Sequence, residues 1–390
     1  MALSERIGQI TRIQETKQRV EAYEALMSEV FNSQKASDAK ALAKHILGSD
    51  LALVEARQVL SIYARLIANL KNDPLLDVGT YVLDIIAPKV KSFEEEDAKI
   101  REQVAEVLTA KRDFYSAART LAGINLESST RNVPVPEKAA KYVQIAELFL
   151  EADDSVSAES YIGRASMIIH LVTDIPLTLR HRVCYARVLD SRREFLQAAR
   201  SYFALSQEGS KNVAENDLLQ LLLCASTCTI LASAGPQRAR LLASLFKDER
   251  TQHLEHYDML QKIYNGHLLR KTEVQKFANS LLPHQQAKLS NGLTVLEKAV
   301  IEHNIVAISK LYISISFEEM GALLEITPQR AEQIIANMVA ETRISAALDQ
   351  VNAVVEFEKE SESIGGWTQE IAAMCSSIDK LVEQMQESKA

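Results

Sequence analysis

Two pairs of residues in the sequence have the types and spacing that could hold a metal ion. His253 and His256 stand three positions apart, and Cys224 and Cys228 stand four apart, so each pair would share one face of a helix. A structural zinc site needs four such ligands, and neither pair has a further cluster at metal-ligand spacing. We therefore predict no metal site and interpret both pairs as structural.

A third pair could supply a nucleophile and its base, because His181 precedes Cys184 by three positions. Both residues lie in the middle of a predicted repeat helix, where packing in the core explains them better. The sequence also lacks His-Glu-x-x-His, His-x-His and a glycine-rich phosphate-binding loop. We therefore predict no catalytic residue and no cofactor site.

The amino-acid composition indicates a mostly helical folded protein. The 390 residues include 47% apolar and 25% charged residues but only 12 Gly and 8 Pro, which is typical of a mostly helical folded chain. The net charge of −8 is spread without a polybasic block, which disfavours nucleic acid and anionic membranes as partners.

Several features predict a protein that stays inside the cell. The first ten residues contain Glu5 and Arg6 and no apolar core of a secretory signal. The uncharged run from Leu218 is interrupted by polar residues and Gly235-Pro236, so a buried helix explains it better than a membrane span. The four cysteines are too few and too scattered for a disulfide framework.

A repeat of about 40 residues organises the first two-thirds of the chain. A small residue followed three positions later by a larger apolar one occurs in two series, which predicts two helices in each period. Stacked helix pairs of this kind build a solenoid with one continuous core. Gly163, inside one predicted helix, is expected to mark a close helix crossing. The pairs are Ala118/Leu121, Ala158/Tyr161, Ala199/Tyr202 and Ala239/Leu242, then Ala105/Leu108, Ala146/Phe149, Ala186/Leu189 and Ala225/Cys228, with weaker echoes at Ala64/Ile67, Val78/Tyr81, Ala25 and Ala39/Leu42.

Residues 292–360 have the pattern of a winged helix. An apolar stripe from Thr294 to Leu311 predicts a helix, and residues 312–316 alternate as a strand with Ile313 and Ile315 on its buried face. Ser316 with Glu319, and Thr327 with Pro328, are start signals for two short helices. Two strands follow at residues 344–350 and 353–358. The polar stretch 283–292 before this domain is a candidate exposed loop.

Winged helices often read DNA with their second short helix, but the charges oppose that use. Residues 292–360 hold eleven acidic and five basic side chains, and the candidate reading helix, 328–343, is neutral overall. A surface that reads DNA needs cations to neutralise phosphates, so contact with protein is favoured.

Two protein interfaces are predicted. An open sheet edge offers unpaired backbone groups to a partner strand, and we place it at Tyr312, Ile313, Ser314, Ile315 and Ser316 and at Ala353, Val354, Val355, Glu356 and Phe357. The second interface is a heptad seam in a tail helix after the joint at 361–366, and it suits a helical bundle with other subunits. Its residues are Trp367, Ile371, Met374, Ile378, Leu381 and Met385.

Helical repeats that run into a winged helix and then a tail helix resemble the PCI family, named for the proteasome lid, the COP-nine signalosome and initiation factor three. Several long segments carry the resemblance in order, and they are most similar to the signalosome branch. These segments are 181–190, 228–235, 245–250, 299–304 and 317–325.

The resemblance implies a mainly α fold: a right-handed TPR- or HEAT-like solenoid at 1–200, a PCI domain at 201–360 (repeats to 291, winged helix from 292), and a joint and bundle helix at 361–390. It implies a non-catalytic scaffold of the complex that removes a ubiquitin-like modifier from cullins. The partners would be other PCI and metalloprotease-fold subunits, with a cullin-RING ligase as substrate and no nucleic acid or membrane. In that family a zinc-bearing partner with a His-x-His motif does the chemistry, and this chain lacks that motif.

Two other functions stay open at this point. A related subunit of the proteasome lid would have the same architecture in a different complex. A winged-helix transcription regulator with a helical-repeat sensor domain would instead bind duplex DNA, and salt would weaken that binding steeply.

Overall fold

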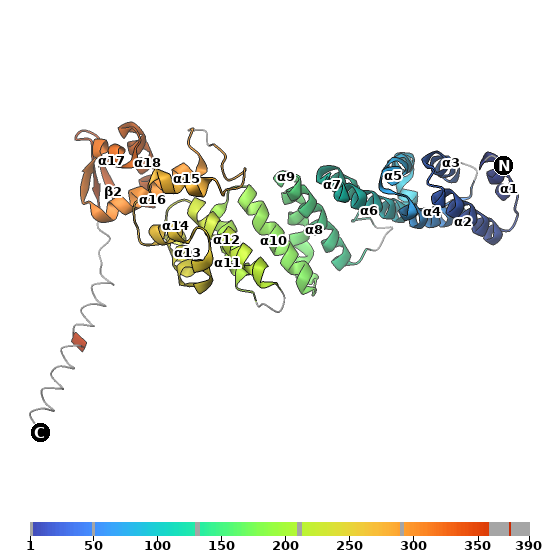
Figure 1. Cartoon of the computed structure of the whole chain (residues 1–390), viewed down its shortest axis with the longest axis horizontal. Coiled ribbons are helices and arrows are strands. Elements are labelled where there is room, and N and C mark those ends of the chain that lie inside the picture. Colours follow the sequence, from blue (N-terminus) through green and yellow to red (C-terminus); the bar gives the residue numbers. More distant parts are fainter. Residues whose placement is uncertain are drawn as a thin grey trace, which may run out of the picture. The chain divides into compact units, whose positions relative to one another are not determined.

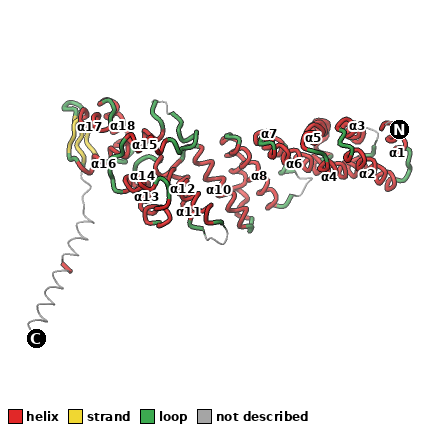
Figure 2. The backbone as a smooth tube through the Cα atoms, in the orientation of Figure 1, coloured by secondary structure: helices red, strands yellow, loops and turns green. Residues whose placement is uncertain are grey.

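The chain forms two compact units, Met1–Arg192 and Arg193–Ala390. The structure, a computed structural model, describes residues 3–48, 51–128, 133–208, 213–288, 292–358 and 374–375 (Figure 1). Helices make up most of both units, and the described strands form one small sheet in the second unit (Figure 2). The mainly α prediction is confirmed.

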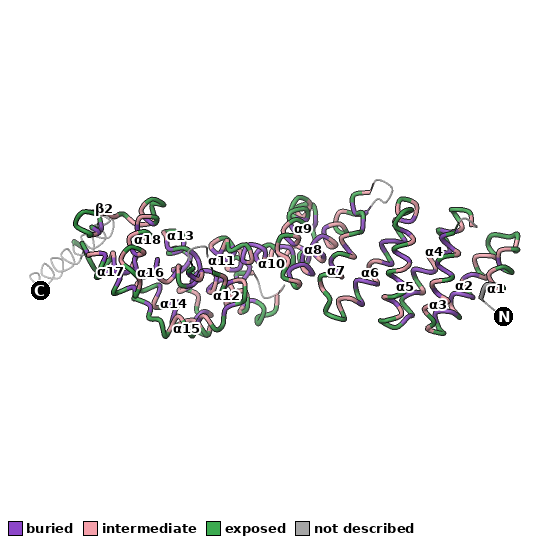
Figure 3. The backbone as a smooth tube through the Cα atoms, turned by 90° about the horizontal axis from the view of Figure 1, so that it is seen from above, coloured by how far each residue is buried: buried purple, intermediate pink, exposed green. Residues whose placement is uncertain are grey.

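The first unit is a helical-repeat solenoid, as predicted. Most of its helices pack against the next helix and several also against the one after it, so neighbours along the chain are neighbours in space. Buried residues, purple in Figure 3, lie on the faces between successive helices. The helices are α1 (Leu3–Thr11), α2 (Thr16–Asn32), α3 (Ala36–Ile46), α4 (Leu53–Leu66), α5 (Asn72–Ile86), α6 (Glu94–Ala110), α7 (Phe114–Ala122), α8 (Val135–Glu151), α9 (Ser155–Ile168) and α10 (Ile175–Ser191), with short 3-10 turns at Ile67–Asn69, Ala87–Ser92 and Ile169–Leu171.

The small residues of the predicted repeat lie where helices meet. Ala118, Ala146 and Ala158 are fully buried, and so are most of their counterparts in the other repeats. Two members are exceptions, because Ala25 and Ala239 are exposed on the outer faces of their helices. In the helix that contains Ala239, Leu241, Leu242 and Leu245 face inward instead.

The second unit continues with helices and ends in the sheet. Its elements are α11 (Phe195–Ser206), α12 (Glu215–Leu231), α13 (Pro236–Lys247), a 3-10 turn (Glu249–His253), α14 (Tyr257–Tyr264), α15 (Lys271–Ala278), α16 (Val295–Leu311), β1 (Ser314–Ser316), α17 (Phe317–Leu324), α18 (Pro328–Ala340), β2 (Ala346–Asp349) and β3 (Val354–Phe357). Helix α12 covers most of the uncharged run from Leu218 and buries eight residues. No described helix is long and apolar enough to span a membrane.

The order of elements after α16 confirms the winged helix. Thr294 caps α16 in a reciprocal box with Glu297, and the Ser316 hydroxyl accepts the Glu319 N–H at the start of α17. Helix α18 begins at Pro328 as predicted, although the Thr327 side chain makes no capping bond. One apolar cluster joins α16, α17, α18 and the sheet around Ile305, Met320, Ile335, Met338 and Val355.

Two local predictions are wrong, and a third holds except at one residue. Ile313 is 66% exposed because β1 begins only at Ser314, so the alternation does not reach it. The stretch 283–288 is a loop as predicted, but Gln285 in it is buried with its side-chain oxygen on the Leu282 N–H. Gly163 marks no close helix crossing, because a Cβ built there meets no atom within 4 Å.

Candidate protein-interaction site

Of the residues that could have done chemistry, Cys184, His181 and Cys228 are buried. His253 is exposed at the end of a 3-10 turn and His256 precedes α14, so the prediction that they share one helix face is wrong. Cys184 is buried, and burial raises the pKa of its thiol to about 12, so it holds no thiolate for attack. His181 is also buried and shares a hydrogen bond of 2.9 Å with the Ser166 hydroxyl. The His256 ring packs edge-on against Phe277. In the described parts of the chain, no group of three or more His, Cys, Asp or Glu could hold a metal ion.

The sheet presents β1 and β2 as its edges, because the strand order is β1-β3-β2 and both pairings are antiparallel. The prediction that residues 353–357 form an open edge is therefore wrong. On one side the Phe357 N–H donates to the Ile313 carbonyl, and on the other the Glu358 N–H donates to the Ser345 carbonyl. The backbone of β3 is used on both sides and has no free edge to offer.

The free edge of β1 can be assigned residue by residue. Phe357 N–H donates to the Ile313 carbonyl at 2.8 Å, and Phe317 N–H donates to the Ala353 carbonyl at 2.9 Å. Bonded positions alternate along an antiparallel strand, so the backbone of Ile315 also faces β3. The backbone N–H and C=O of Ser314 and Ser316 therefore point away from the sheet.

Exposed apolar residues adjoin this edge. Leu311, Tyr312 and Ile313 are consecutive and are 70%, 43% and 66% exposed. Large apolar side chains on a surface are informative when they are contiguous, as they are here. The β1 edge, defined as residues 311–316, therefore combines outward backbone groups with apolar surface.

Helix α16 fixes the winged helix to the helices before it. Glu302 is 1% exposed, and its carboxylate accepts from Arg343 at 2.6 and 3.2 Å and from the Ala234 N–H at 3.2 Å. Arg343 follows α18, and Ala234 lies between α12 and α13. One buried carboxylate thus joins three parts of the second unit.

The next two residues of α16 extend this joint. His303 donates from Nε2 to the His267 carbonyl at 3.0 Å, and both amide atoms of Asn304 bond the backbone of Leu269. These bonds hold the segment between α14 and α15 against α16. Sequence reasoning missed this joint, although the polar triplet 302–304 inside an otherwise apolar helix was a visible signal.

The buried imidazole predicts a pH dependence of stability. Burial, assisted by the charge of Arg238, lowers the pKa of His303 to about 4, whereas a histidine in the unfolded chain has a pKa of about 6.5. The folded pKa is the lower one, so the stabilisation is complete above pH 6.5 and is lost as the pH falls from 6.5 to 4. We expect the opening free energy of α16 amides, measured by hydrogen exchange, to fall by about 3 kcal/mol across that window.

The matched variant for this prediction is His303→Gln, which retains a donor for the His267 carbonyl. In His303→Gln, the opening free energy of the α16 amides should not fall between pH 6.5 and 4. In the control His170→Gln, at an exposed position, it should fall as in the parent protein. An unchanged pH profile in His303→Gln would contradict the assignment.

The surface of α18 does not suit DNA. Arg343 is committed to Glu302 and lies 2.7 Å from Glu341, and its side chain is only 13% exposed. Gln350 beyond the helix bonds Glu332 on it. Within α18, Arg330 is matched by Glu332, so the helix has no excess positive charge with which to contact the phosphates of duplex DNA.

The predicted tail seam lies almost wholly outside the described residues. Of its members only Met374 is described, and it is 71% exposed. The tail interface stays a prediction from the sequence.

Comparison with known proteins covers both parts of the chain. The family model described as PSMD12/CSN4, N-terminal, matches residues 3–215, and the model described as PCI domain matches residues 274–359.

Full-length relatives extend the match over the whole chain. The protein named COP9 signalosome complex subunit 4 of Arabidopsis thaliana is 40% identical over 98% of each chain. The protein of that name in Dictyostelium discoideum is 38% identical over 98% of this chain and 97% of its own. The one in Drosophila melanogaster is 40% identical over 87% of this chain and 83% of its own.

Proposed function

This chain belongs to the family of COP9 signalosome complex subunit 4, and we propose from that premise that it is a non-catalytic scaffold of a signalosome that removes the ubiquitin-like modifier from cullins. The observation that carries the proposal is the match along nearly the whole length, through both the solenoid and the winged helix. A role in regulating cullin-RING ubiquitin ligases follows from the activity of such a complex.

In this proposal the isopeptidase step belongs to a metalloprotease-fold partner subunit. The burial of Cys184 and His181 in the solenoid supports a non-catalytic role for this chain. Other PCI subunits are the neighbours in the complex, and the complex works in the cytoplasm and nucleus. This chain contributes surfaces, and its rigid joint at α16 keeps the winged helix in a set orientation to α12–α15.

The β1 edge is the contact for a neighbouring PCI subunit. A strand added there would bond the outward groups of Ser314 and Ser316 and cover the apolar side chains of Tyr312 and Ile313. The β2 edge also has free backbone groups, but the contiguous apolar stretch adjoins β1. This supports β1 as the strand used.

The tail helix provides a second anchor in a bundle with other subunits, through the seam from Trp367 to Met385. Aspartate at both Ile378 and Leu381 would place two charges in that seam and remove the chain from the complex. The control variant changes Asp379 and Glu383, which lie on the predicted outer face of the helix, to lysine. It should assemble normally. Normal assembly of the seam variant, measured by size-exclusion chromatography, would refute the bundle.

We assign contact with the cullin-RING substrate to the solenoid. Each repeat contacts only its neighbours, so terminal repeats should be dispensable for folding of the rest. A chain that begins at Val133 tests this assignment. It should enter the complex and bind the cullin-RING ligase less well. Failure to assemble would make the solenoid structural instead.

A further inference from the structure

One type of turn recurs three times in the described residues. A residue with left-handed backbone is followed by an acidic residue that precedes the next helix, at Arg112-Asp113, Asp153-Asp154 and Arg193-Glu194, with φ of 63°, 58° and 65°. The first two acidic side chains cap their helices by accepting the N–H of Ser116 and of Ser157. Glu194 makes no such capping bond at the start of α11.

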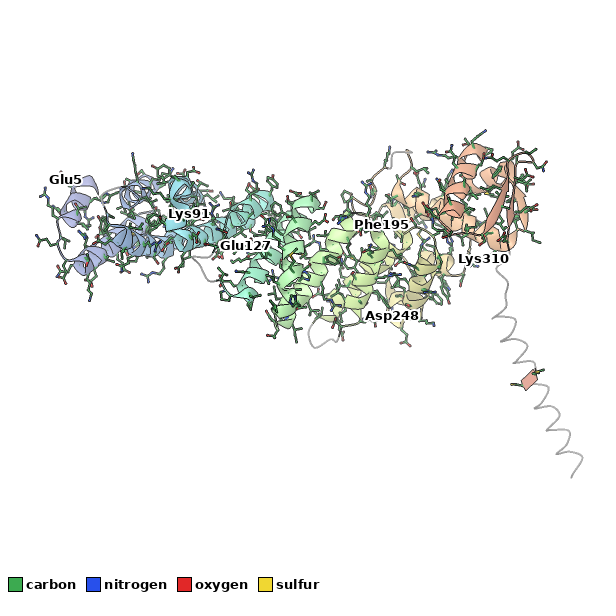
Figure 4. All side chains as sticks on the ribbon, turned by 180° about the vertical axis from the view of Figure 1, so that it is seen from behind. Glu5, Lys91, Glu127, Phe195, Asp248 and Lys310 are labelled. Atoms are coloured by element: carbon green, nitrogen blue, oxygen red, sulfur yellow. The ribbon has the colours of Figure 1, made fainter. Side chains whose placement is uncertain are left out.

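A groove opens beside this uncapped helix start. It is a cavity of about 670 Å³ within the second unit, formed where α11, the end of α12 and α16 converge. Phe195, the first residue of α11, lines the groove and is labelled in Figure 4. The volume is within the range of roughly 300–1,000 Å³ that is usual for ligand sites. We call it the α11–α16 groove.

The floor of the α11–α16 groove is apolar. Phe195, Leu231, Val295 and Ala299 line it and are each less than a tenth exposed. A ligand that uses the whole groove must therefore carry apolar as well as polar groups, because a simple anion would leave this floor against water.

The rim has more positive than negative charge. Arg193 and Arg200 line it and are exposed, and Arg200 donates to the neutral side chain of Gln237 rather than to a carboxylate. Lys298 lies 3.7 Å from Glu302, whose carboxylate is already bound by Arg343. Three cations and two carboxylates, those of Glu194 and Glu302, thus line the groove, and Arg343 already neutralises Glu302.

We propose that the α11–α16 groove binds an acidic, extended segment of a partner protein. Carboxylates of the segment would pair with Arg193, Arg200 and Lys298 near the start of α11, and an apolar side chain would cover Phe195 and Val295. Charge complementarity selects this occupant, since a basic segment would meet three like charges. The contact is separate from the β1 edge, and it does not depend on the proposed function.

The test uses the full chain and defined peptides. An array of ten-residue peptides that combine Asp or Glu with Leu or Phe is compared with a matched array in which Lys replaces the acidic residues, and binding of the best peptides is measured by fluorescence anisotropy. We expect selective binding of acidic peptides. The double variant Arg193→Glu with Arg200→Glu should weaken that binding at least tenfold.

Two controls separate the groove from general charge effects. Arg240→Glu with Lys276→Glu makes the same charge change at exposed positions outside the groove and should leave binding unchanged. Inorganic phosphate at millimolar concentration should compete poorly. Equal weakening by both double variants, full displacement by phosphate, binding of the Lys array, or no binding by the acidic array would each overturn the proposal.

Discussion

Replacement of Glu302 by alanine is expected to lower the stability of the second unit by about 3–5 kcal/mol, because it leaves a buried arginine without its partner. Arg343 would keep its charge at a position where its side chain is only 13% exposed, and the Ala234 N–H would lose its acceptor. The measurement is hydrogen exchange of amides in α16 and α18, because it reports local opening in a chain of several cooperative parts.

Two companion variants make this prediction specific. Glu341→Ala removes the other carboxylate near Arg343, but that group is 62% exposed and its loss should cost at most about 1 kcal/mol. Glu302→Met with Arg343→Met removes both charges and should recover most of the loss. If Glu302→Ala and Glu341→Ala had equal effects, the buried joint would not have the role that we assign to it.

Proline at Ser314 is expected to reduce assembly by about tenfold to a hundredfold while the chain stays folded. The Ser314 N–H points away from β3, so proline removes a donor to a partner strand and leaves the bonds to β3 in place. The loss corresponds to roughly 1–3 kcal/mol for a buried group left unpaired in the interface. Assembly is measured by titration of the variant into a complex that lacks this subunit.

Neighbouring positions provide the controls. Ser314→Ala keeps the N–H and should assemble like the parent. Ile315→Pro removes a donor that faces β3 and should unfold the winged helix itself, which circular dichroism would detect. Unimpaired assembly of a folded Ser314→Pro chain would exclude the β1 edge as the contact.

Much of the fold could be predicted because it rests on local patterns. The 40-residue spacing of small residues identified the helix pairs, since close packing demands small side chains wherever two helices cross. Start signals such as Ser316 and Pro328 located the first residues of α17 and α18, although α18 ends at Ala340, before the predicted 343. The predictions that Ala239 and Gly163 lie at helix contacts were wrong, because a small residue also fits an exposed helix face. Nothing in the sequence distinguishes a small residue at a helix contact from one on an exposed face.

The candidate site was less predictable, because it depends on contacts between distant residues. That β3 is the central strand follows from its pairing with both β1 and β2, and strand order is not encoded in the alternation of any one strand. The joint of Glu302 spans 41 residues to Arg343 and 68 to Ala234. The α11–α16 groove likewise requires residues from four helices, α11, α12, α13 and α16, whose approach no local pattern specifies.

Purification of the tagged chain from its own cells, followed by mass spectrometry of the proteins bound to it, tests the central claim most directly. We predict recovery of the other PCI subunits and the metalloprotease-fold subunit of a signalosome, with cleavage of the modifier from a cullin by the complex and none by the isolated chain. Recovery of proteasome-lid subunits in their place, or cleavage by the isolated chain, would contradict the account.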